Sequence, residues 1–254
     1  MKSTALFLAA LAGLAALALP AHTTHAQTLC NSDGVPRPTA VFERFIHADC
    51  AACWSAANPP APSPTPSTAV LDWIVPSAAG DDAPLSAAAT TDAQQRLQAL
   101  GRTLRSGTDV HIATVEPMAA KGGAPARLRV ARGLAFNDYL GTAIEFAPAR
   151  KAASSRASDA SGASGAAWTY TLVLAEEVPA GTEGTAVARQ LVRNVLQGQW
   201  RADEPRTTRS AWAAWMETRS MRIPEGAKVD RLNMVGWVQD AEGRIVAAAQ
   251  SVCR

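Results

Sequence analysis

Two cysteines separated by two alanines are the residues of this sequence whose type and spacing could do chemistry. Cys50 and Cys53 stand in the stretch HADCAACWS, residues 47–55. Two sulfurs three residues apart can form a reversible disulfide, bind a metal ion together with other ligands, or staple a turn. The neighbouring residues narrow this choice, although they do not name a substrate.

Redox chemistry needs a thiol that ionises easily, and the start of a helix favours one. The residues after Cys50 are good helix formers without glycine, and Asp49 is a candidate N-cap. Cys50 then falls in the first turn, where free N–H groups favour a thiolate, and Cys53 lies one turn deeper. We therefore expect Cys50 to attack and Cys53 to resolve. A protonated His47 nearby favours the Cys50 thiolate, whereas the Asp49 carboxylate opposes it.

We expect neither a metal nor another cofactor at this pair. A metal site needs about four ligands, and the only histidine after residue 26 besides His47 is His111. A c-type haem requires a histidine directly after the second cysteine, where Trp54 stands. A static disulfide at the first turn of a helix has the same sequence features as a redox-active one, so both roles stay open.

The first 26 residues predict that the protein is exported. Lys2 precedes an apolar run from Ala5 to Leu19, and small residues follow, which is the pattern of a secretory signal peptide cleaved after Ala26 or, as the alternative, after Ala21. The run is shorter than the roughly 20 apolar residues of a membrane-spanning helix, and no later segment could span a bilayer. We therefore expect a periplasmic or secreted protein without a membrane span in its mature form.

Export brings all four cysteines into an oxidising compartment, where disulfides persist. Four cysteines allow three pairings. The most economical pairing joins Cys50 to Cys53, and joins Cys30, near the mature N-terminus, to the penultimate residue Cys253. The second bridge would tie the two ends of the chain together. Closing so long a loop stabilises a protein by about 4–5 kcal/mol in the chain-entropy model.

The charge of the chain argues against nucleic acid as a partner. The formal net charge is +2 and no dense basic run is present, whereas binding to a phosphate backbone requires clustered Lys and Arg. The partner that the cysteine pair would suit is a protein with a thiol or disulfide, or a small thiol. The sequence indicates no oligomeric state.

The first half of the chain predicts a strand that leads directly into the cysteine pair. Aromatic and β-branched residues favour this strand, and leucines at helical spacing favour a later helix. The predicted elements are strands at 39–48, 69–75 and 109–115, a short helix after residue 49, a stiff Pro-rich connector at 59–67, and a helix over 90–107.

The second half of the chain is richer in predicted strands. Its predicted elements are strands at 126–133, 141–149 and 167–178, a flexible Ser/Ala/Gly-rich loop at 149–167, helices over 183–200 and 209–219, and a closing hairpin over 231–250 that turns at Ala241–Gly243. The helix over 183–200 rests on Val187, Leu191, Val195 and Leu196, which share a helical face.

The stretch AVFERFIHADCAACWSAANPP resembles the start of an uncharacterised family of secreted bacterial thioredoxin-like proteins, which carries a small-residue CxxC near its mature N-terminus. The later residues that match the family's pattern are Gly181, Glu183, Gly184, Arg193, Asn194 and Val195. The resemblance covers about half of residues 27–254. It places Cys50 and Cys53 on the family's cysteine pair. Thioredoxin-like enzymes set a cis-proline against that pair, and Pro117 is the nearest candidate here by position.

The resemblance implies an α+β fold. We expect one thioredoxin-like domain over residues 27–254, a mixed sheet with flanking helices and additional antiparallel strands in its C-terminal part. Two functions remain open. One is thiol–disulfide exchange through Cys50 and Cys53. The other is a secreted, non-catalytic binding or structural domain that is stapled by two disulfides.

Overall fold

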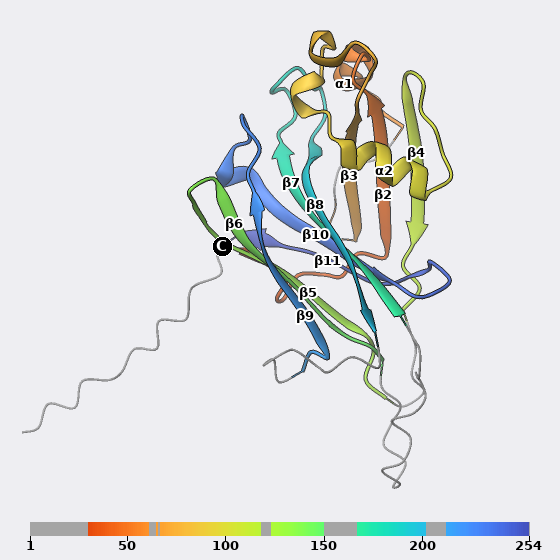
Figure 1. The fold of residues 1–254 in the computed structure, drawn as a ribbon, viewed down its shortest axis with the longest axis vertical. Helices are drawn as coiled ribbons and strands as arrows, with labels where there is room; N and C mark the ends of the chain where they lie inside the picture. Colours follow the sequence, from red (N-terminus) through yellow and green to blue (C-terminus); the bar gives the residue numbers. More distant parts are fainter. Residues whose placement is uncertain are drawn as a thin grey trace, which may run out of the picture.

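Two β-sheets packed face to face form most of the computed structural model (Figure 1). The structure describes residues 30–60, 65, 67–117, 123–149, 167–201 and 212–253. The five-stranded sheet has the order β12 (Val252–Cys253), β1 (Cys30–Asn31), β5 (Arg127–Phe136), β6 (Tyr139–Ala147) and β9 (Trp215–Arg222). The seven-stranded sheet has the order β11 (Ile245–Gln250), β10 (Leu232–Gln239), β7 (Ala167–Val178), β8 (Arg189–Arg201), β3 (Thr68–Val75), β2 (Ala40–His47) and β4 (Thr108–Thr114). The described helices are α1 (Ala51–Ser55), α2 (Thr91–Ala99) and the 3-10 turns Gly80–Asp82, Ser86–Ala88 and Val229–Arg231.

The largest apolar cluster fills the space between the two sheets. Strands β5, β6 and β9 supply one wall, and β7, β8, β10 and β11 supply the other. At its centre the Phe146 ring lies 5.4 Å from the ring of Trp168 and 6.2 Å from the rings of Trp200 and Trp215, measured between centroids. Aromatic side chains bury the most apolar area per residue, so this cluster holds the sheets together.

Strand β7 is buried on both of its faces. Leu172 and Leu174 point into the space between the sheets, and Val173 and Ala175 point to the opposite side. Helix α2 packs against that opposite side, and Figure 1 shows it lying across β3. Burial on both faces explains why the middle of the strand, residues 172–175, is an uninterrupted apolar run rather than an alternating pattern.

Local signals in the sequence set both ends of α2. The Thr90 hydroxyl accepts a hydrogen bond from the Ala93 N–H at 3.2 Å, which caps the first turn. At the other end Gly101 adopts a left-handed φ of 66°, and the Arg102 N–H donates to the Leu97 carbonyl at 2.9 Å. The helix therefore ends before the glycine and is shorter than the predicted span 90–107.

Strands β2 and β3 bring the cysteine pair to one edge of the seven-stranded sheet. They pair in parallel, from Ala40 opposite Thr68 to His47 opposite Val75. Both strands therefore end at the same edge, and α1 begins there (Figure 1). Strand β4 pairs antiparallel with β2 and places Thr114 opposite Ala40, so β4 ends at the opposite edge.

The prediction of a thioredoxin-like core is wrong. Strand makes up 52% of the structure and helix 12%, and the two short α-helices do not flank a mixed sheet in the thioredoxin manner. Strand β8 occupies most of the predicted helix over 183–200, and β9 overlaps the end of the predicted helix over 209–219. The strands predicted in the first half of the chain and the closing hairpin, β10 and β11, are confirmed.

Two further predictions lie outside the described residues. These are the signal peptide, residues 1–26, and nearly all of the loop predicted at 149–167, of which only the flanking residues are described. Within the described ranges, no helix is both long and apolar enough to cross a membrane.

Candidate functional site

The Cys50–Cys53 disulfide stands where β2 leaves the sheet. The chain turns after His47, whose carbonyl accepts a hydrogen bond from the Cys50 N–H at 2.8 Å. Cys50 is the N-cap of α1, and its sulfur accepts from the Cys53 N–H at 3.2 Å. The two sulfurs are bonded, and the two Cα atoms lie 5.2 Å apart.

The disulfide is partly exposed above an apolar cluster. Both cysteines have intermediate exposure, and the two alanines between them are exposed. Below the pair lie the buried side chains of Ile46 and Ile74, from β2 and β3, and of Trp54 from α1. The lower side of the pair is therefore packed, and solvent reaches its upper side.

Trp54 fixes α1 to the loop between β7 and β8. Its indole N–H donates to the Glu183 carbonyl at 2.8 Å. Glu183 itself has a left-handed φ of 49° and is followed by Gly184. Its carboxylate pairs with Lys228 and Arg231, and the hydrogen bond from Lys228 is the main cause that lowers the pKa of Glu183 below its ordinary value. The loop that receives Trp54 is thereby held in place by ion pairs.

Arg189 lies beneath α1 and is fully buried. Its Nη2 donates to the carbonyls of Cys53, at 3.2 Å, and of Trp54, at 2.6 Å. Its guanidinium also lies 5.0 Å from the centre of the Trp54 ring. Burial lowers the pKa of Arg189, and the negative charge of Asp72 opposes that shift. The helix that carries the disulfide is thus held from below by a buried cation.

Asp72 connects this cation to three strands of the sheet. Its Oδ1 accepts from Arg44 Nε on β2 at 2.5 Å and from Arg189 Nη1 on β8 at 3.2 Å. Its Oδ2 accepts from the Gln190 N–H at 3.0 Å. Buried charges need partners of this kind, because removal from water is costly. The network therefore ties β2, β3 and β8 together below the cysteine pair.

His47 and Asp49 contact each other at the same edge. The Nδ1 atom of His47 lies 3.2 Å from Oδ2 of Asp49, at an angle that makes no hydrogen bond. The sequence predicts Asp49 as the N-cap of α1. In the structure Cys50 occupies the capping position instead. Both residues lie at the edge of the sheet where the cysteine pair stands.

The structure does not bring Pro117 to the cysteine pair. Pro117 is exposed and follows β4, whose last residues lie at the edge of the sheet opposite to Cys50. The length of β2 separates the two positions, roughly 25 Å at the usual rise of a strand. No peptide bond in the described part of the chain is cis.

The second cysteine pair joins the first and last described strands. Cys30 on β1 is bonded to Cys253 on β12, across 223 positions of sequence, and the two residues are paired in the antiparallel ladder. Cys30 is fully buried, and Arg132 Nη2 lies 3.5 Å from the sulfur of Cys253. Both pairs expected from the sequence are therefore at disulfide distance, and the protein is a disulfide-stapled domain.

Sequence reasoning missed the buried charges that support α1. Asp72 interrupts the apolar run of β3, and a lone carboxylate in a buried strand indicates a partner cation. That signal was available from the sequence. Arg189 could not be identified, because its segment was predicted as a helix and its partner lies 117 residues away.

The chain was also compared with known proteins. No family model, no curated protein and no solved structure matches it. Among the described residues no three or more His, Cys, Asp and Glu side chains are grouped as metal ligands. Any function assigned to the cysteine pair therefore rests on its geometry, without support from a related protein.

Proposed function

We propose that the protein exchanges thiols and disulfides through Cys50 and Cys53 after export from the cytosol. The observation that carries the proposal is the partly exposed Cys50–Cys53 disulfide, which stands between the end of β2 and the start of α1. In the other pair Cys30 is fully buried and Cys253 is exposed, and both residues are held in the paired β1–β12 ladder that joins the ends of the described chain. The first pair suits exchange, and the second suits a structural bridge.

The exchange begins when a partner thiolate attacks the Cys50 sulfur. A mixed disulfide forms, the Cys50–Cys53 bond breaks, and Cys53 leaves with the electron pair and takes a proton. A second partner thiolate attacks the partner sulfur of the mixed disulfide and releases Cys50. The partner is then oxidised by two electrons to a disulfide, and the protein is reduced to a dithiol. In the reverse direction Cys50 attacks and Cys53 resolves.

Cys50 is assigned as the attacking sulfur because its surroundings stabilise a thiolate. Its sulfur already accepts the Cys53 N–H, and a hydrogen bond to sulfur is stronger when the sulfur is charged. The partner would be a protein with a thiol or disulfide, or a small thiol. Export is proposed because both bridges persist only in an oxidising compartment. Recovery of a protein that begins at Gln27 from the periplasm would support it, and recovery of the intact chain from the cytosol would contradict it.

The exchange proposal is tested by trapping the mixed disulfide. Cys53→Ser leaves Cys50 without its resolving partner, so incubation with glutathione disulfide should attach one glutathione to Cys50, as detected by mass spectrometry. Cys50→Ser is the matched control and should react at least tenfold more slowly. We also expect a reduction potential for the wild-type pair above about −300 mV, the upper range of structural bridges. Equal reactivity of the two variants, or a potential well below that value, would contradict the proposal.

A second candidate function is a secreted, non-catalytic binding or structural domain with two staples. The observation that favours it is the tight anchoring of α1 through Trp54 and Arg189, which limits movement of the pair. Mild reductant followed by an alkylating agent separates the two functions. Exchange requires labelling of Cys50 in the folded protein, whereas a staple predicts no labelling until the protein unfolds.

A further inference from the structure

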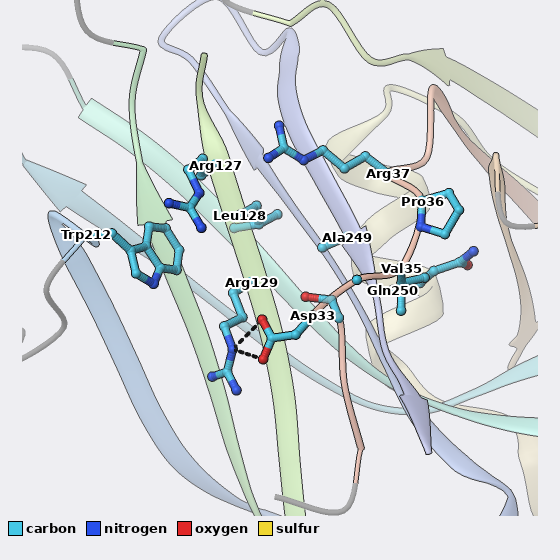
Figure 2. Close-up of a pocket in the computed structure, with 12 residues that line it drawn as sticks. Asp33, Val35, Pro36, Arg37, Arg127, Leu128, Arg129, Trp212, Ala249 and Gln250 are labelled. Atoms are coloured by element: carbon cyan, nitrogen blue, oxygen red, sulfur yellow. Dashed lines mark hydrogen bonds and ion pairs between the residues drawn. The ribbon is translucent and has the colours of Figure 1, made fainter. Parts of the chain in front are cut away.

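A hollow lies at the start of β2, at the opposite end of this strand from the cysteine pair. The segment before β2, the beginning of β5, the end of β11 and Trp212 surround a cavity of about 280 Å³. Figure 2 shows this cavity, with Arg37 approaching from one side and Arg127 and Trp212 from the other. The size of the cavity suits a small molecule rather than a protein segment.

Three guanidinium groups line the cavity, and Arg129 is the most firmly held. Its Nε donates to both carboxylate oxygens of Asp33, at 3.0 and 2.9 Å, and its Nη1 donates to Glu145 at 2.8 Å. Figure 2 shows the Asp33 carboxylate facing the Arg129 guanidinium among the residues that line the cavity. Asp33 comes from an exposed turn, so Arg129 already receives one solvent-accessible carboxylate in this position.

The other two guanidinium groups are positioned without a carboxylate. The Arg127 guanidinium lies 4.6 Å from the centre of the Trp212 ring. One nitrogen of Arg37 donates to the Ala126 carbonyl at 3.1 Å. Among the residues that the structure describes, no acidic side chain pairs with Arg127 or Arg37. Each group is therefore oriented by a contact that leaves most of its five N–H donors available.

The charge of the lining is positive. Asp33 is the only acidic residue among the described lining residues, against three arginines. Guanidinium groups are planar, and their paired donors match the oxygens of a carboxylate or a phosphate. Because ring stacking and a backbone carbonyl already orient the side chains, less conformational entropy is lost when an anion binds.

We propose that this cavity binds a small organic anion with a carboxylate or phosphate group. Arg127 and Arg37 bind its oxygens, and the apolar surface of Val35, Pro36 and Leu128 contacts the remainder of the ligand. Asp33 competes with the anion for Arg129. The site lies a strand length away from Cys50, so anion binding does not depend on thiol exchange.

The proposal is tested by isothermal titration calorimetry at constant ionic strength, with phenyl phosphate and benzoate as the two probes. We expect saturable binding of at least one probe, and the tighter of the two identifies the anionic group. Arg127→Gln and Arg37→Gln should each weaken binding at least tenfold, because each removes a charge and its donors. Asp33→Asn should tighten binding about threefold or more, because it frees Arg129.

The matched control is Arg105→Gln, which removes the same charge from an exposed loop. That loop lies near the other end of β2, where the Gly107 carbonyl accepts the His47 N–H. The affinity of the Arg105→Gln variant for the tighter-binding probe should stay within twofold of wild type. Absence of saturable binding of both probes to the wild-type protein would overturn the proposal. Equal weakening in the control, or weaker binding after Asp33→Asn, would also overturn it, because general charge attraction would then explain the data.

Discussion

At the scale of single residues, the position of the cysteine pair depends on buried charges that lie beneath α1. Arg189 and Asp72 are fully buried, and together with Arg44 they connect α1 to three strands. Removing one member of a buried charge network leaves the other charges in an apolar interior without compensation. The position of α1 and the stability of the sheet are therefore coupled at Asp72.

Asp72→Asn should destabilise the protein by about 3–5 kcal/mol, the usual cost of breaking a buried ion pair from one side. The asparagine keeps the size of the side chain but removes the charge that both arginines face. Urea unfolding monitored by tryptophan fluorescence measures the change. The control is Asp81→Asn, an exposed carboxylate in a 3-10 turn, whose replacement should change stability by less than about 0.5 kcal/mol. If both variants lost a similar free energy of unfolding, the buried network would contribute no more to stability than an exposed carboxylate does.

The cysteines themselves were the part of the site that the sequence predicted well. The flanking residues predicted a strand before Cys50 and a helix after it, and the structure has β2 and α1 there. The supporting residues were not predicted, because contacts such as that between Trp54 and Glu183 join segments 129 residues apart. Neither propensity nor periodicity carries information on partners so distant in sequence.

At the scale of elements, β8 shows why the predicted helix was wrong. Val187, Leu191 and Val195 recur every four residues. In the structure Val187 precedes β8, and a register shift beside Arg193 places Leu191 and Val195 in different apolar clusters, so their helical spacing does not mark a shared face. Leu191 and Val192 are both buried, in different apolar clusters, which requires a strand covered on both sides.

The contact between the two sheets depends on the absence of a side chain at Gly236 on β10. A Cβ there would lie 2.7 Å from Cγ1 of Val130 on β5 and 3.3 Å from Cδ1 of Ile144 on β6. Gly236→Ala should therefore force the sheets apart and cost about 1–3 kcal/mol. The control is Gly141→Ala on β6, where a Cβ would meet no atom within 4 Å. A fall in melting temperature confined to the first variant is expected, and an equal fall in both would argue against close sheet contact.

At the scale of the whole molecule, the Cys30–Cys253 bridge holds the ends of the described chain together. The strands β1 and β12 contain two residues each, and the ladder between them has two residue pairs, while the other side of β1 pairs with β5. So short a ladder would separate readily without the covalent bond. The bridge therefore completes the edge of the five-stranded sheet.

Replacing both Cys30 and Cys253 by serine should lower stability by about 2–5 kcal/mol, because the unfolded chain regains the freedom of a very long loop. Replacing Cys50 and Cys53 by serine should cost about 2 kcal/mol or less, because that loop is short. Urea unfolding of the two double variants gives the comparison directly. If the short-loop variant lost as much stability as the other, the assignment of the terminal bridge as the main staple would be wrong.

The terminal bridge also decides how the protein responds to mechanical force. Tension applied between residues 30 and 253 passes through a single sulfur–sulfur bond, because these two residues are directly connected. The sheets between them belong to a loop in parallel with that bond and carry no load while it is intact. Stretching the chain by its ends would therefore extend the folded core only after the bond had been reduced.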